Sequence, residues 1–185
     1  MNLPNKITLA RICLIPVFMA VLMCGNYFGW QYFGIWAAVV FAIASLTDGI
    51  DGHIARSRGL VTDFGKFADP LADKLLVSTA LICFVQLGWM PAYMAVIIVA
   101  REFIVTGLRT IAASKGIVMA AIMTGKIKTT IQIIAILCTM LFSTADFTIC
   151  GYPGIGFITM AISTLFTIYS GIEYIARNSS LLSDM

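Results

Sequence analysis

Four aspartates lie in two closely spaced pairs before the middle of this 185-residue chain. Asp48 and Asp51 are three positions apart, and Asp69 and Asp73 are four positions apart. On helices, each spacing puts both carboxylates on one face, and two antiparallel helices joined by a short loop would direct all four at one volume. Because unpaired carboxylates repel each other and lose hydration there, the pattern predicts divalent metal with oxygen ligands, and two ions suit four carboxylates better than one.

The alternative is an ordinary solvated loop in which the aspartates pair with nearby cations. The candidates for that pairing are Arg56, Arg58, Lys66 and Lys74. Helical spacing on both sides of the loop favours the metal site. Asp63 fits neither helix face and is predicted to be a loop residue. Gly52 would let a ligand approach the backbone, and metal beside Arg56 would accommodate a diphosphate.

The elements that position these residues are predicted to be membrane-spanning helices. The chain is 60% hydrophobic and 11% charged, whereas soluble domains carry about 25% charged residues. A spanning helix needs about 20 apolar residues. Six such runs occur, at 7–25, 31–52, 68–88, 91–113, 120–143 and 153–176. They are too long and continuous for barrel strands, so the predicted fold is an all-α, polytopic bundle of six transmembrane helices in a single domain, 1–185.

The basic residues predict the orientation. The connections near 25–31, 88–91 and 143–153 contain no Lys or Arg, and all 12 basic residues lie in or near the opposite ends of the runs. The positive-inside rule makes those ends cytoplasmic, together with both termini and the aspartates. The first run has no convincing cleavage site and is interpreted as a retained helix rather than a signal peptide. A net charge of +3 gives no argument for nucleic acid.

The five cysteines form no CxxC pair, and the chain has one histidine, His53. A zinc site or a disulfide framework is therefore not expected. Cys24 and Cys150 are predicted to lie at the outer surface, and whether they meet is left open.

The aspartates belong to a longer pattern that resembles a known family. The pattern reads Asp48-x2-Asp51-Gly52-x2-Ala55-Arg56-x8-Gly65-x3-Asp69-x3-Asp73. At every fixed position it is similar to the signature of the CDP-alcohol phosphotransferases. The resemblance implies transfer of a substituted phosphate from a CDP-linked donor to an alcohol with release of CMP, and it suggests a homodimer.

Three further segments, at 2–8, 65–74 and 101–109, look like those of one bacterial group within this family. Its members transfer the phosphatidyl group of CDP-diacylglycerol to sn-glycerol 3-phosphate, giving phosphatidylglycerophosphate and CMP. The resemblance implies an enzyme of phospholipid biosynthesis, multi-pass in the bacterial plasma membrane, with its active site facing the cytoplasm and membrane lipids around it.

The same resemblance assigns roles to the signature residues. Two Mg²⁺ or Mn²⁺ ions would be held by Asp48, Asp51 and Asp69, with Asp73 near the second ion and acting as general base toward the acceptor hydroxyl. The residues that resemble the family's nucleotide contacts are Asn5, Thr8, Arg11, Gly52, Ala55, Arg56 and Gly65. For Asn5, Thr8 and Arg11 the alternative is a polar helix start with an orientation-setting arginine.

Cations on the fourth and fifth runs are candidates for binding the acceptor phosphate. They are Arg101, Arg109, Lys126 and Lys128. Arg101 and Arg109 lie close to one helical face, and arginine within a membrane span is costly enough to suggest function. The alternative is orientation charge alone, or pairing of Arg101 with Glu102 or an aspartate. Glu173 and Arg177 are predicted to form an i,i+4 pair.

Other functions remain in view. Inositol phosphate or serine could replace glycerol phosphate as acceptor, and a basic pocket would not distinguish the two phosphate acceptors. A divalent-cation transporter would also place carboxylates in its spans, although near the bilayer midplane. A transferase of the phospholipase D type is excluded, because it needs two HxK sites and the chain has one histidine.

Overall fold

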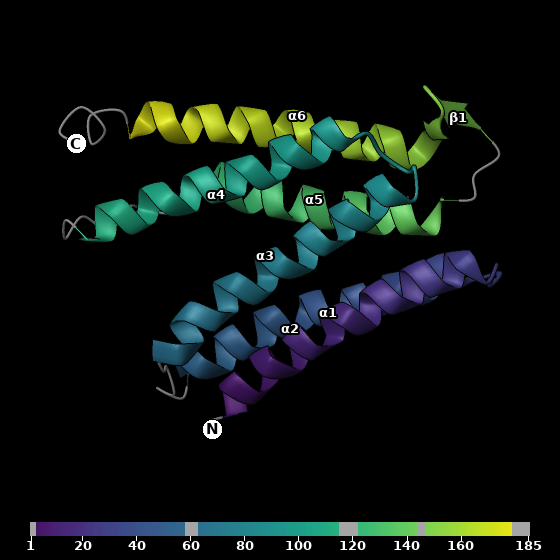
Figure 1. The fold of residues 1–185 in the computed structure, drawn as a ribbon. Coiled ribbons are helices and arrows are strands. Elements are labelled where there is room, and N and C mark those ends of the chain that lie inside the picture. The colour runs from purple at the N-terminus through teal and green to yellow at the C-terminus, as the bar shows by residue number, and fades with distance from the viewer. Residues whose placement is uncertain (1–2, 58–62, 115–121, 144–146, 179–185) are drawn as a thin grey trace. The chain divides into compact units, whose positions relative to one another are not determined.

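The computed structural model describes residues 3–57, 63–114, 122–143 and 147–178, and side chains for 8–47, 71–114, 122–143 and 147–178. Within these ranges the elements are α1 (Leu3–Tyr27), α2 (Phe33–Ser57), α3 (Asp63–Gln86), α4 (Ala92–Ser114), α5 (Met123–Leu141), β1 (Thr148–Ile149), β2 (Tyr152–Pro153) and α6 (Gly154–Arg177) (Figure 1). The six helices correspond one to one with the six apolar runs, so the described residues are mostly helical, as predicted, and the two short strands are the exception to the all-α prediction.

The observed helix ends differ from the predicted ones by a few residues, and the two largest differences enclose the acidic segment. α2 continues past residue 52 to Ser57, and α3 already begins at Asp63. Asp63 is therefore the first residue of a helix, and the prediction of a loop residue was wrong. The first turn of a helix is a favourable position for an acidic residue, because its charge complements the helix dipole.

The helices are those of a membrane protein. Within the described part of the chain, three segments are long and apolar enough to cross a bilayer: Thr8–Tyr27, Met123–Leu141 and Gly154–Arg177. The described apolar part of α2, Phe33–Thr47, is shorter. Large apolar side chains such as Leu165 and Ile172 remain about two-thirds exposed, at 67% and 64%. Such surfaces suit contact with lipid.

One compact unit, hereafter unit 1, comprises Met1–Leu87 and Met140–Thr144. In it α1 packs against both α2 and α3. The rings of Phe18 on α1 and Phe41 on α2 lie 5.7 Å apart in a tilted arrangement, and both side chains are fully buried. Gly34 lies so close to the end of α5 that a Cβ there would come within 2.4 Å of the Met140 carbonyl oxygen. Close packing of α1, α2 and α3 thus supports the helices that carry the acidic signature.

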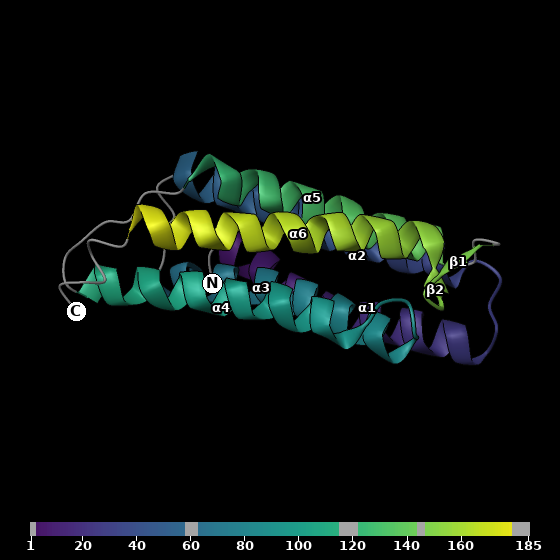
Figure 2. The same ribbon diagram turned by 90° about the horizontal axis from the view of Figure 1, so that it is seen from above.

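The second unit, unit 2, comprises Gly88–Thr139 and Ala145–Met185. α4 packs along α6, as Figures 1 and 2 both show. Before α6 the chain makes a small antiparallel hairpin, in which Thr148 pairs with Pro153 and Ile149 with Tyr152. Its turn contains Cys150 and Gly151, both with positive φ (54° and 84°). The sequence marked this connection only by its Gly and Pro residues, because two-residue strands are too short for a periodic pattern.

Candidate functional site

The four signature aspartates all lie on helices. Asp48 and Asp51 are near the end of α2, and Asp69 and Asp73 follow the start of α3. α2 and α3 contact each other. The Asp73 side chain is half-buried, while the side chains of Asp48, Asp51 and Asp69 lie outside the described part. The helical placement that the spacing required is present, and the four-carboxylate metal cluster stays a prediction.

For most of the predicted nucleotide contacts, the structure gives the helix on which the residue lies but not its side chain. Gly52, Ala55 and Arg56 fall on α2 and Gly65 on α3, and their side chains, like that of Asn5, lie outside the described part.

Thr8 and Arg11 can be placed in detail. They lie three residues apart on α1, the helix that packs against α2 and α3, and each side chain is only 1% exposed. An arginine that merely sets orientation would extend its head group to water. A fully buried arginine instead indicates that the guanidinium serves an interior contact.

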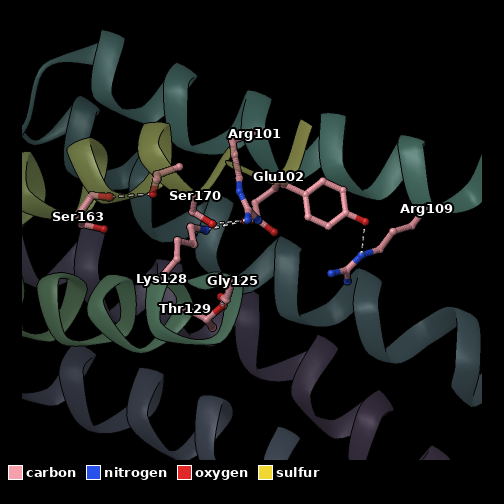
Figure 3. A network of polar contacts seen from close by, with 10 residues as sticks. Arg101, Glu102, Arg109, Gly125, Lys128, Thr129, Ser163 and Ser170 are labelled. Carbon is pink, nitrogen blue, oxygen red and sulfur yellow. Dashed lines mark hydrogen bonds and ion pairs between the residues drawn. The ribbon is translucent and has the colours of Figure 1, made fainter. Parts of the chain in front are cut away.

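In unit 2, three charged side chains and a serine form a partly buried network, which we call the charge cluster: Arg101 and Glu102 on α4, Lys128 on α5, and Ser170 on α6 (Figure 3). Glu102 Oε1 accepts hydrogen bonds from Arg101 Nη1 at 3.1 Å and from Lys128 Nζ at 2.5 Å. Arg101 Nη2 also donates to Ser170 Oγ at 2.8 Å. Two cations and one anion leave the charge cluster with a formal charge of +1.

Burial makes these pairings consequential. The exposed fractions are 13% for the Arg101 side chain, 27% for Glu102 and 2% for Lys128. A charge removed from water is stable only when it is paired and hydrogen-bonded. The suggested pairing of Arg101 with Glu102 is therefore present, and Lys128 shares the same carboxylate.

Glycines on the neighbouring helices make room for Arg101. A Cβ at Gly171 on α6 would lie 3.2 Å from Arg101 Cγ, and one at Gly125 on α5 would lie 3.8 Å from Arg101 Nη2. A residue with a bulkier side chain at either position would occupy space next to the arginine. The sequence thus accommodates a long charged side chain between α5 and α6 by omitting side chains beside it.

Arg109 is held differently, by a neutral partner. Its Nε donates a hydrogen bond to the Tyr174 hydroxyl at 3.1 Å (Figure 3), and its guanidinium carbon lies 5.3 Å from the centre of the tyrosine ring. Tyr174 is 2% exposed, whereas Arg109 is exposed. Among the described residues, the Arg109 guanidinium makes no further hydrogen bond or ion pair. Its Nη nitrogens are therefore available for an anion.

The predicted acceptor residues separate into two groups. Arg101 and Arg109 both contact α6, which confirms that they share a helix face, and Lys128 joins Arg101 through Glu102. Lys126 is exposed and has no ion pair with the described residues. From the sequence, Lys126 and Lys128 were equivalent candidates, because both lie near the start of the same helix. Only the packing of that helix decides which of the two faces the interior.

Five buried polar residues on α6 were not singled out from the sequence: Ser163, Thr164, Thr167, Ser170 and Tyr174. A signal for them exists in their spacing of three or four residues within an apolar helix, which places them on one face. In a membrane helix such a stripe indicates an interior surface. Gln132, one turn after Lys128 on α5, is likewise buried, at 3% exposure, and its Nε2 has no hydrogen-bond partner among the described residues.

The sequence is similar to known proteins over nearly its whole length. The family model of CDP-alcohol phosphatidyltransferases matches residues 1–169. The chain is 48% identical to a Bacillus subtilis protein named CDP-diacylglycerol–glycerol-3-phosphate 3-phosphatidyltransferase, over 96% of this chain and 95% of that protein. It is 37% identical to a Mycobacterium tuberculosis protein named "Probable phosphatidylglycerophosphate synthase", over 95% of this chain and 81% of that one. A Rickettsia felis protein with the same name as the Bacillus one is 36% identical, over 94% and 93% of the two chains.

Proposed function

The chain belongs to the CDP-alcohol phosphatidyltransferase family, and we propose that it transfers the phosphatidyl group of CDP-diacylglycerol to sn-glycerol 3-phosphate, giving phosphatidylglycerophosphate and CMP. The observation that carries the proposal is the complete aspartate signature, which runs from Asp48 to Asp73 across the end of α2 and the start of α3. The names of the relatives, which match nearly the whole chain, support the same donor and acceptor.

The signature supplies a donor set that fits Mg²⁺ or Mn²⁺. Its four carboxylates are hard oxygen ligands, and they lie on two helices that contact each other. We assign Asp48, Asp51 and Asp69 as metal ligands, with Asp73 beside them. When bound, the ions would neutralise the donor diphosphate and stabilise the departing phosphate of CMP.

The remaining steps belong to side chains of this chain. Thr8, Arg11 and Arg56 hold the nucleotide, with Arg56 contacting its diphosphate. Asp73 takes the proton from the acceptor hydroxyl as that oxygen attacks the phosphorus of the phosphatidyl group in line. The new O–P bond forms as the bond to CMP breaks, so no covalent intermediate with the enzyme is needed.

The cations of unit 2 account for an acceptor that carries a phosphate. The Nη nitrogens of Arg109 have no partner among the described residues, and their planar fork suits phosphate oxygens. The charge cluster adds a net positive charge of one. Serine, which has no phosphate, would make little use of these groups, whereas glycerol 3-phosphate and inositol phosphate would both use them.

We further propose that all six helices span the bacterial plasma membrane, with both termini and the active site on the cytoplasmic side. The connections that would face outward contain no Lys or Arg. One of them is flanked by exposed aromatic residues: Tyr27, Phe28, Trp30, Tyr32 and Trp36. Aromatic side chains of this kind favour the membrane interface. The homodimer suggested by the family resemblance remains part of the proposal.

The proposal is tested by CMP release from the purified protein with CDP-diacylglycerol and Mg²⁺. Glycerol 3-phosphate, inositol phosphate and serine are offered separately, with Asp69→Asn as the metal-site variant. Of the three acceptors, we expect only glycerol 3-phosphate to give CMP release. This activity should be lost in Asp69→Asn and after chelation of the metal.

Two other outcomes would contradict the proposal. Turnover with another acceptor would keep the metal chemistry but overturn the acceptor assignment. Cation uptake into liposomes without any CMP release would indicate a transporter instead.

A further inference from the structure

We propose that Tyr174 is a positioning residue for Arg109 and, through it, sets the affinity for the phosphate of the acceptor. The inference rests on the proposed function, because it assumes that Arg109 contacts that phosphate. It assigns a role in acceptor recognition to α6, a helix that carries none of the residues predicted for the site.

The contact between the two residues fixes one edge of the guanidinium. The Tyr174 hydroxyl accepts a hydrogen bond from Nε, the nitrogen nearest the aliphatic stem. The ring lies 5.3 Å from the guanidinium carbon, within the range of a cation–π contact. With Nε engaged, the fork that can bind two phosphate oxygens is the pair of Nη nitrogens.

Burial makes Tyr174 a firm support for an otherwise mobile side chain. Tyr174 is 2% exposed and lies on the buried face of α6, one turn beyond Ser170. Arg109 is exposed near the end of α4. An exposed arginine samples many rotamers, and restricting it before the ligand arrives lowers the entropy lost on binding.

Charge distinguishes Arg109 from the other candidate cations. Arg101 and Lys128 share the Glu102 carboxylate, which offsets part of their attraction for an anion. Tyr174 is neutral, so it orients Arg109 without compensating its charge. Among the described cations in unit 2, Arg109 therefore combines an ordered guanidinium with an uncompensated charge.

The primary test is Tyr174→Phe, which removes the hydroxyl and keeps the ring. We expect the KM for glycerol 3-phosphate to rise about 3- to 10-fold, the net effect of one hydrogen bond. The kcat and the KM for CDP-diacylglycerol should stay unchanged. The matched control is Tyr169→Phe, at an exposed tyrosine on the same helix (57% exposed), which should leave all three constants unchanged.

A second variant separates positioning from general destabilisation. A lysine side chain lacks the guanidinium Nε that donates to the Tyr174 hydroxyl. In the Arg109→Lys enzyme, Tyr174 should therefore no longer orient the side chain at position 109. We expect Tyr174→Phe to add nothing to the KM of the Arg109→Lys enzyme. An equal fold-increase in both backgrounds would show that Tyr174 acts independently of Arg109 and would overturn the inference.

The two proposals fail in different ways. A wild-type enzyme without turnover on glycerol 3-phosphate overturns the proposed function. A wild-type enzyme that turns it over, with the same acceptor KM in Tyr174→Phe, overturns the role of Tyr174 alone.

Discussion

The two compact units assemble their candidate chemistry in different ways. In unit 1 the signature residues lie at fixed spacing along one stretch, from the end of α2 into the start of α3. In unit 2 the charged residues come from separate helices, and Arg101 reaches Ser170 across 69 positions of sequence. The proposed metal site is thus encoded locally, whereas the cations proposed for the acceptor depend on tertiary packing. Replacements of the signature residues in unit 1 should mainly affect catalysis, and those in the charge cluster of unit 2 should affect binding and stability together.

The largest effect is expected for Asp73→Asn in unit 1. Loss of a general base should lower kcat by about 10²- to 10⁴-fold, while Mn²⁺ still binds through the other three aspartates and thermal stability stays near the wild-type value. CMP release and a Mn²⁺ titration measure these quantities. Asp63→Asn, at the first residue of the same helix and outside the signature, is the control and should retain turnover. Full activity of Asp73→Asn with normal metal binding would refute the base role.

In unit 2, Lys128→Met should affect stability and acceptor binding together. The change leaves Glu102 with Arg101 as its remaining cation in the charge cluster, and loss of one partner of a buried pair costs about 3–5 kcal/mol. We expect the lower end, about 3 kcal/mol, because Glu102 is 27% exposed. The measurement is thermal unfolding in detergent, with the acceptor KM in parallel. The exposed Lys126→Met is the matched control, and equal stability of the two variants would contradict the charge cluster.

A smaller effect is expected from packing in unit 1. Gly34→Ala would place a Cβ within 2.4 Å of the Met140 carbonyl oxygen. The backbone would have to shift to avoid this overlap, which should lower the free energy of unfolding by about 1–3 kcal/mol. Gly107→Ala on α4 is the control, since a Cβ there meets nothing within 4 Å. That change should stabilise α4 by about 0.5–1 kcal/mol. Opposite shifts in unfolding temperature would confirm the packing, whereas shifts in the same direction would not.

The smallest effect is expected at the surface of unit 2. The predicted pair of Glu173 and Arg177 is present, with its nitrogen and oxygen 2.7 Å apart. Because the Arg177 side chain is 64% exposed, Arg177→Gln should cost no more than about 0.5 kcal/mol. Thermal unfolding at low and high salt measures this cost. A loss of stability clearly above about 0.5 kcal/mol would contradict the interpretation of this contact as a solvent-exposed ion pair.

Much of the fold could be predicted because each long apolar run has one outcome in a bilayer, a helix. The six helices follow from that rule, and so does the placement of both aspartate pairs on helices. The exact ends did not follow, since polar residues such as Asp63 can extend a helix beyond its apolar part. The hairpin before α6 was missed, because its two-residue strands leave no periodic signal.

The candidate site was predictable only where local spacing decides. The spacing of Asp48, Asp51, Asp69 and Asp73 was enough to place them on helices, and that of Arg101 and Arg109 was enough to put both on one face. The choice of Glu102 as the partner of Lys128 was not predictable, because it depends on how α4 and α5 are rotated about their axes. The contact of Arg109 with Tyr174 was hidden for the same reason, although the polar stripe on α6 pointed to that face.

The position of three charges within α4 has a consequence for how the protein is made. Arg101, Glu102 and Arg109 lie on this helix. If α4 spans the bilayer as proposed, each unneutralised charge near the middle of the bilayer costs about 2.5–3.5 kcal/mol during insertion. Glu102 and Arg101 neutralise each other in part, but Lys128, Ser170 and Tyr174 are synthesised later, on α5 and α6. The ribosome must therefore deliver two more helices before α4 has all its polar partners. We expect α4 to remain beside the translocon, or at the lipid boundary, until α6 emerges.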